Sequence, residues 1–196
     1  MWSEEEIAQF RSMAARLELD PRNLLGPIAS ESNCSPAAHN PGGAVGLIQF
    51  EPSTLRDLGW NAGTDAFAQL TVSEQLPYVE RYFQARIGAL RAAHGTMGAI
   101  YTAMFLPALI SHAVDQTYVL CGQHGPLAWA YAANKSFDVD RKGWVTVDDL
   151  VGSAERALAR PGPSAILSAI EDAQEAEEKA AAGALASLAA IPPDVT

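Results

Sequence analysis

The segment from Leu24 to Leu58 constrains the fold of this chain more than any other. Its first part has apolar residues at helical spacing and places Glu31 at the C-terminal end of a helix. Turn-forming residues occupy positions 33–40, and a glycine-containing apolar segment, Gly43–Phe50, follows them. This order predicts a helix that carries one glutamate at its own end, beside a polar loop.

Amphipathic patterns along the rest of the chain predict a mainly α-helical fold. Apolar stripes and capping residues indicate helices over residues 7–17, 21–31, 53–58, 73–90, 97–110, 126–133 and 147–158. The segment 97–110 is apolar nearly all round, which is typical of a buried central helix. Alternating segments long enough for a substantial sheet are missing, so we expect at most a small β-hairpin, near 43–50.

The composition changes after Arg160, where Pro161-Gly162-Pro163 interrupts the chain and Ala and Glu then dominate. We therefore predict a first domain over residues 1–160 and an Ala/Glu-rich C-terminal helix or tail over 161–196. Two interpretations of the second part stay open. It is either an amphipathic helix that packs back on the domain through Ile166, Leu167 and Ile170, or a solvated tail that tethers the protein.

Bulk properties exclude several classes of function. The formal net charge of -10 disfavours a nucleic-acid partner, because phosphate binding needs a basic face. The longest apolar run, residues 99–110, is too short for a membrane span and contains Pro107. The N-terminus has neither part of a signal peptide, so we expect cytoplasmic synthesis. Cys34 and Cys121 are expected to be free thiols, although a bridge between them stays open.

The loop 138–149 follows the template of a calcium-binding EF-hand loop. Asp138, Asp140 and Asp149 occupy positions where ligands belong. Lys142, however, stands where an oxygen ligand is expected, and its ammonium group would take the place of the ion. We therefore predict that no cofactor is required, with a calcium site at the three aspartates as the alternative.

Glu31 is the candidate catalytic residue. Cleavage of a glycosidic bond needs a proton for the leaving oxygen, and a carboxylic acid with a raised pKa supplies one near neutral pH. The negative end of the helix dipole and apolar neighbours both disfavour the ionised carboxylate. The position of Glu31 therefore predicts a general acid.

The motif around Glu31 resembles that of soluble lytic transglycosylases and the related goose-type lysozymes, in particular phage-type members. Glu31-Ser32 is followed by Asn40 and then by Gly43-Ala44-Val45-Gly46-Leu47-Ile48-Gln49, with the family's spacing. The resemblance implies a lysozyme-like α-helical domain that cleaves peptidoglycan. It further implies cleavage of the β-1,4 bond between N-acetylmuramic acid and N-acetylglucosamine, with Glu31 as the single acid and base and a 1,6-anhydro product.

The resemblance also implies a set of substrate-binding residues: Ser32, Asn40, Gln49, Phe50, Tyr131 and Asn134. Gln49 would bind the acetamido group of the sugar, or alternatively tie two loops together. Phe50 would either stack on a sugar or pack in the core. The segment Ala130-Tyr131-Ala132-Ala133-Asn134 is similar to the family's Ala-Tyr-Asn motif, which places a tyrosine opposite the glutamate. Here Asn134 follows Tyr131 by three positions instead of one, and a packing role in the core is the alternative for Tyr131.

Two other functions stay open. Glu51 stands where the family usually has methionine, and either Glu51 or Asp57 would supply the second carboxylate of a hydrolytic lysozyme. Alternatively, the chain is a non-catalytic glycan-binding module of a phage tail or secretion assembly. We expect peptidoglycan strands as the partner, no membrane insertion, and delivery to the cell wall by a virion, a holin-type system or a secretion route.

Overall fold

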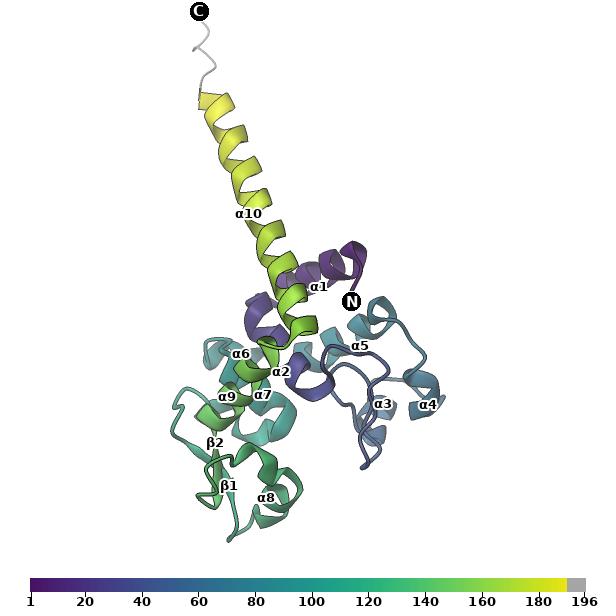
Figure 1. Ribbon diagram of the computed structural model, residues 1–196, viewed down its shortest axis with the longest axis vertical. Coiled ribbons are helices and arrows are strands. Elements are labelled where there is room, and N and C mark those ends of the chain that lie inside the picture. The colour runs from purple at the N-terminus through teal and green to yellow at the C-terminus, as the bar shows by residue number, and fades with distance from the viewer. Residues whose placement is uncertain (190–196) are drawn as a thin grey trace, which may run out of the picture.

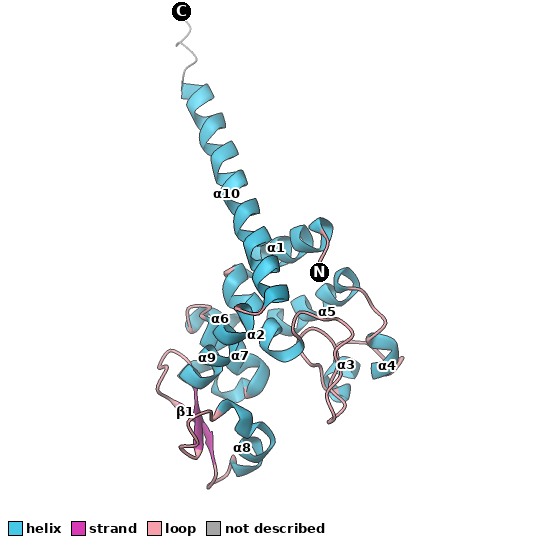
Figure 2. Ribbon diagram, viewed as in Figure 1, coloured by secondary structure: helices cyan, strands magenta, loops and turns pink. Residues whose placement is uncertain are grey.

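The computed structural model describes residues 1–189, which form a mainly α-helical fold with one small antiparallel sheet (Figures 1 and 2). The α-helices in this range are α1 (Glu4–Leu17), α2 (Pro21–Ser32), α3 (Pro52–Asp57), α4 (Thr64–Phe67), α5 (Val72–Gln84), α6 (Ile87–Ala92), α7 (Met97–Phe105), α8 (Ala128–Asn134), α9 (Val147–Leu158) and α10 (Pro161–Ala189). Two 3-10 helices, η1 (Pro107–His112) and η2 (Lys135–Phe137), and two strands, β1 (Val119–Gly122) and β2 (Trp144–Thr146), complete the elements. The predicted mainly α fold is confirmed.

Local signals explain most helix boundaries. Asp20 caps α2 by accepting a hydrogen bond from the Asn23 amide, as the sequence predicts. The predicted helix over 73–90 is wrong in its bounds, because it divides into α5 and α6. Its cap is Thr71, which forms a capping box with Glu74. The predicted helix over 97–110 ends at Phe105, because Pro107 disfavours helical backbone at the residue before it, Leu106.

The small sheet lies elsewhere than predicted. Strand β1 pairs antiparallel with β2, and the connection between them contains α8. The segment 43–50 instead holds two isolated bridges, from Val45 to His39 and to Phe50. This segment is too short and too strongly turned, with left-handed backbone at Gly43, Gly46 and Gln49, to form a regular hairpin.

The helices α2, α7 and α9 pack closely at the centre of the fold. Glycines permit this approach, because a Cβ atom at Gly98 of α7 would lie 2.6 Å from Cγ1 of Val147 in α9. A Cβ atom at Gly26 of α2 would lie 3.2 Å from the Cβ of Ala154 in α9. The contact brings the C-terminal end of α2 next to side chains of the other two helices.

We expect Gly98→Ala to lower the stability of the fold. Overpacking in a core costs about 1–3 kcal/mol, whereas alanine in place of glycine stabilises a helix by roughly 1 kcal/mol. The net effect should be a free energy of unfolding lower by ~1 kcal/mol in urea denaturation. Gly88→Ala in α6 is the matched control, since no atom lies within 4 Å of its added Cβ. Equal stability of Gly98→Ala and wild type would contradict the close contact.

Helix α10 packs on the domain with its first turns and then projects away from it (Figure 1). Ile166, Leu167 and Ile170 are buried, as the helical interpretation of this segment predicts. Further along, Glu177 forms a two-pronged ion pair with Arg11 of α1. The division into domains at residue 160 stays a prediction, and part of the predicted tail, 190–196, lies outside the described residues. Within 1–189, no helix has the length and apolarity needed to cross a membrane.

Candidate active site around Glu31

Glu31 occupies the last turn of α2, as the sequence predicts. The helix ends at Ser32 because Asn33 adopts left-handed backbone with φ 53°, and its amide bonds the carbonyl of Ala29. The buried side of α2 faces the core, whereas Glu31 itself is partly exposed at the helix end. This placement holds Glu31 at the border between core and solvent.

The carboxyl group of Glu31 is bound by a buried tyrosine that the sequence analysis missed. The hydroxyl of Tyr101 in α7 lies 2.8 Å from Oε1 of Glu31 and 2.8 Å from Oγ of Ser30. The hydroxyl of Ser30 is in turn 2.8 Å from the hydroxyl of Ser153 in α9. The side chain of Tyr101 is fully buried, and its ring packs edge-on against Phe137. Side chains from three central helices are thus linked by hydrogen bonds to one carboxyl group.

The surroundings raise the pKa of Glu31. Burial is the main cause, because it disfavours the ionised form, and the hydrogen bond from Tyr101 acts in the opposite direction. The pKa of Tyr101 is raised well above its ordinary value, first by burial and then by the nearby charge of Glu31. Tyr101 therefore remains a neutral hydrogen-bond donor, and the pKa of Glu31 is shifted in the direction that favours a general acid.

Tyr131 does not occupy the place that its motif predicts. Its hydroxyl donates a 2.8 Å hydrogen bond to Oδ2 of Asp138, and the tyrosine that reaches Glu31 is Tyr101. Asn134 binds the carbonyl of Ala130 within α8. The substrate contacts of Tyr131 and Asn134 stay predictions. The sequence around Tyr101, Ile100-Tyr101-Thr102, shares only the tyrosine with the Ala-Tyr-Asn motif and therefore gave no signal for this contact.

Ser32 joins the Glu31 helix to the glycine-containing loop. Its hydroxyl is buried and lies 2.8 Å from the carbonyl of Leu47 and 3.0 Å from that of Ile28. This contact fixes the loop against the end of α2. Ser32 therefore has a structural role beside the candidate catalytic residue. Its contact with substrate stays a prediction.

The other predicted loop residues differ in their exposure. Gln49 is partly exposed, and its Nε2 donates to the carbonyls of Gly46 and Ala38 at 3.0 and 3.2 Å. Asn40 is exposed, and its Oδ1 accepts a hydrogen bond from the Ala44 amide. Both amides therefore shape the loop and still border solvent, so a substrate contact for either remains open.

Phe50 belongs to the core, and this decides between its two interpretations. Its side chain is 2% exposed, and its ring centroid lies 5.5 Å from that of Phe67 and 5.9 Å from that of Tyr82. Edge-on aromatic contacts of this kind stabilise a core. A sugar has no access to a ring buried in this way, so the predicted stacking contact is corrected to a packing role.

Gln75 of α5 holds the glycine-containing loop in place, and the sequence analysis missed it. This fully buried side chain accepts a hydrogen bond from the Leu47 amide at 3.0 Å and donates to the carbonyls of Pro36 and Phe67 at 2.8 and 3.1 Å. A Cβ atom at Gly46 would lie 2.6 Å from its Oε1. The motif glycine therefore has a steric reason: its missing side chain makes room for the amide of Gln75.

The aspartate-rich loop is closed by internal bonds. Nζ of Lys142 lies 2.6 Å from Oδ1 of Asp149, which also accepts the capping hydrogen bonds of Thr146 through its other oxygen. Asp138 accepts hydrogen bonds from the amides of Lys142 and Gly143. Within residues 1–189, no group of three or more His, Cys, Asp or Glu side chains is arranged to hold a metal ion.

The two cysteines are free and buried, so the open alternative of a disulfide between them is not realised. Burial raises the pKa of the Cys34 thiol to about 12 and that of Cys121 to about 11. Both side chains are therefore protonated thiols that pack as small apolar groups near neutral pH.

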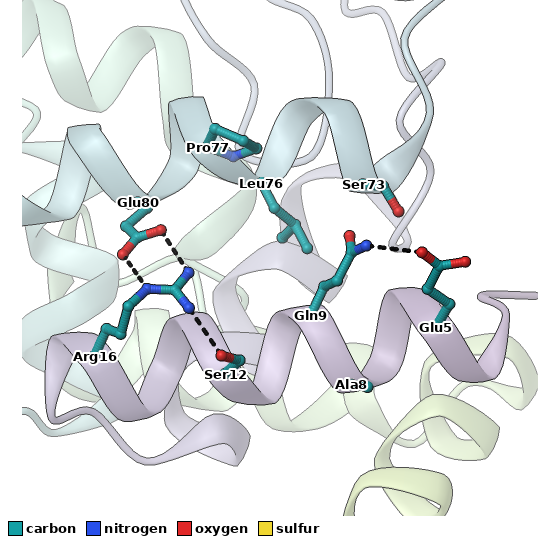
Figure 3. A pocket seen from close by; sticks show the side chains of 9 residues that line it. All are labelled: Glu5, Ala8, Gln9, Ser12, Arg16, Ser73, Leu76, Pro77 and Glu80. Carbon is teal, nitrogen blue, oxygen red and sulfur yellow. Dashed lines mark hydrogen bonds and ion pairs between the residues drawn. The ribbon is translucent and has the colours of Figure 1, made fainter.

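A separate groove of about 490 Å³ lies between α1 and α5 (Figure 3). Its polar side chains bind one another: Arg16 pairs with Glu80 and with Ser12, and Gln9 donates to Glu5. Glu31 does not line this groove. Because Arg16 and Glu80 are already paired and Glu31 lies elsewhere, we assign the groove no role in catalysis.

The fold and the site define a lysozyme-like helical domain with one tyrosine-bound carboxyl group at a helix end. Comparison with protein families agrees with this class, because residues 9–87 match the family described as "Transglycosylase SLT domain". The match contains Glu31, the glycine-containing loop and Gln75, and it confirms the resemblance to lytic transglycosylases and their lysozyme-like relatives. Neither the curated proteins nor the solved structures gave a significant match. The family match supports a peptidoglycan-cleaving function of the lytic transglycosylase type.

Proposed function

We propose that this protein is a peptidoglycan lytic transglycosylase that uses Glu31 as its single acid and base. The observation that carries the proposal is the partly exposed carboxyl group of Glu31, whose pKa is raised by burial and which is bound by Tyr101. It lies beside the loop that matches the family motif. The proposed bond is the β-1,4 linkage between N-acetylmuramic acid and N-acetylglucosamine.

The proposed reaction needs one carboxyl group in two protonation states. Protonated Glu31 donates its proton to the glycosidic oxygen, and the bond from that oxygen to the anomeric carbon breaks. The resulting carboxylate takes the proton of the muramoyl 6-hydroxyl, whose oxygen then bonds the anomeric carbon. Tyr101 supports the carboxylate in between by donating a hydrogen bond to Oε1. The product is a 1,6-anhydro ring, and the enzyme returns to its protonated state.

We expect the released muropeptides to end in 1,6-anhydromuramic acid, one water lighter than hydrolysis products. A hydrolase needs a second carboxylate that activates water, whereas here the substrate's own hydroxyl attacks at high effective concentration. Mass spectrometry of digested peptidoglycan measures the product. Glu51→Met should leave it unchanged, because Glu51 is an exposed residue at the start of α3. Reducing-end muramic acid that disappears in Glu51→Met would identify a lysozyme instead, and no release of fragments would favour a binding module.

We further propose that the protein needs no calcium. The ammonium group of Lys142 lies 2.6 Å from Asp149 and supplies the positive charge that an ion would bring to the loop. Chelation with EDTA should therefore leave the melting temperature unchanged, since only a bound ligand stabilises the folded state by mass action. Thermal melts with EDTA and with added calcium test this. A lower melting temperature in EDTA that calcium restores would contradict it.

A further inference from the structure

The hydrogen bonds around Glu31 raise a question of proton direction. The hydroxyl of Tyr101 has one proton, yet two acceptors, Oε1 of Glu31 and Oγ of Ser30, both lie 2.8 Å from its oxygen. The proton is available to Glu31 only when Ser30 acts as a donor to Tyr101 instead of as an acceptor. Something must therefore set the direction in which the Ser30 hydroxyl points.

Ser153 of α9 is placed to set that direction. Its hydroxyl lies 2.8 Å from that of Ser30, and either atom is a possible donor. The Ser153 hydroxyl pairs with that of Ser30 and also acts directly on Tyr101. When Ser153 donates to Ser30, Ser30 donates to Tyr101, and Tyr101 donates to Glu31. Each hydroxyl then keeps its own proton and makes one bond as donor, so the chain of bonds runs in a single direction.

We propose that Ser30 and Ser153 are positioning residues that direct the Tyr101 proton onto Oε1 of Glu31, so that the acid proton of Glu31 resides on Oε2. The inference rests on the proposed function, since it assigns the two carboxyl oxygens different tasks. Oε1 accepts from Tyr101 in both protonation states, and Oε2 exchanges its proton with the substrate. Hydrogen bonds that follow one another in such a chain polarise each other, and bonds to a charged acceptor are stronger than bonds to a neutral one.

Few other groups affect this chain of hydrogen bonds from Ser153 to Glu31. Among the described residues, Tyr101 on α7 is the titratable group that shifts the pKa of Glu31, and no charged side chain contributes. Helix α9 contributes the neutral hydroxyl of Ser153 to the chain of hydrogen bonds. Ser153 and Ser30 both act to lower the pKa of Tyr101. Both serines thus stabilise negative charge on the Tyr101 oxygen, as hydroxyl groups that donate toward it do.

The test is a titration of the Glu31 carboxyl group by NMR on ¹³C-labelled full-length protein, with Glu31→Gln used to assign the signal. Tyr101→Phe removes a bond to the ionised form and should raise the pKa of Glu31 by about one unit. Ser30→Ala and Ser153→Ala should raise it in the same direction by a few tenths of a unit, roughly the share that polarisation contributes. Ser153→Thr, which keeps the hydroxyl, should restore the wild-type pKa. Ser168→Ala, on the exposed side of α10, is the control.

A double-variant comparison separates positioning from a general effect of burial. If Ser153 acts through Tyr101, Ser153→Ala should cause no further shift in the Tyr101→Phe background. The falling limb of the pH profile of glycan cleavage should follow the same order as the pKa values. An unchanged pKa in Ser153→Ala, or an equal shift with and without Tyr101, would overturn the inference. The titration needs no activity, so absence of glycan cleavage by the wild type would refute the proposed function separately.

Discussion

Glu31→Gln is expected to abolish glycan cleavage, with a loss of at least ~10²-fold, because the amide has no acidic proton to donate. The variant should still fold, since the glutamine oxygen accepts the hydrogen bond that Tyr101 donates to Glu31. Release of soluble fragments from purified peptidoglycan measures the activity, and thermal melting measures the fold. The combination of a wild-type melting temperature and lost activity would assign the loss to chemistry.

The matched control for this variant is Glu175→Gln, which makes the same change on the exposed surface of α10. It should cleave peptidoglycan at the wild-type rate. Turnover of Glu31→Gln close to that of the control would contradict the role of Glu31 and, with it, the proposed mechanism. Loss of activity in both variants would show that charge on the protein as a whole, rather than the proton of Glu31, governs cleavage.

Gln75→Leu is expected to destabilise the fold strongly. Leucine has a similar volume, so little cavity forms, but the Leu47 amide and the Pro36 carbonyl lose their bonds to Gln75, whereas the Phe67 carbonyl keeps its bond from the Leu70 amide. Each unsatisfied buried group costs about 1–3 kcal/mol. We therefore expect a free energy of unfolding lower by ~3 kcal/mol or more in urea denaturation.

The effect of Gln75→Leu should also reach the site, because Gln75 binds the loop that Ser32 joins to the end of α2. The rate of glycan cleavage by Gln75→Leu should therefore be lower than that of the wild type, even at temperatures well below the melting temperature, where the variant is folded. Gln84→Leu, at the exposed end of the same helix, is the control and should change the stability little. Equal stability of the two variants would show that the Gln75 amide does not hold the loop.

Local sequence signals predicted those parts of the protein that depend on neighbouring residues. The cap Asp20-Pro21, the apolar spacing of α2 and the turn formers after Ser32 suffice to place Glu31 at a helix end. The start of α9 at Val147 followed from its sequence in the same way. The compound motif from Glu31 to Gln49 predicted the family, because several spacings had to agree at once. Domain boundaries and substrate contacts remain predictions from the sequence.

The tertiary structure alone decided which side chains meet Glu31. Tyr101 and Tyr131 both lie in predicted helices, so the sequence did not distinguish them. The packing of α7 against α2 and α9 brings Tyr101 to Glu31, whereas Tyr131 bonds Asp138. The roles of Phe50 and Gln75 depend in the same way on packing across distant segments. A periodic pattern shows which face of a helix is buried, but not which residue of another helix lies opposite. That pairing is set by the close contact of helices far apart in the chain.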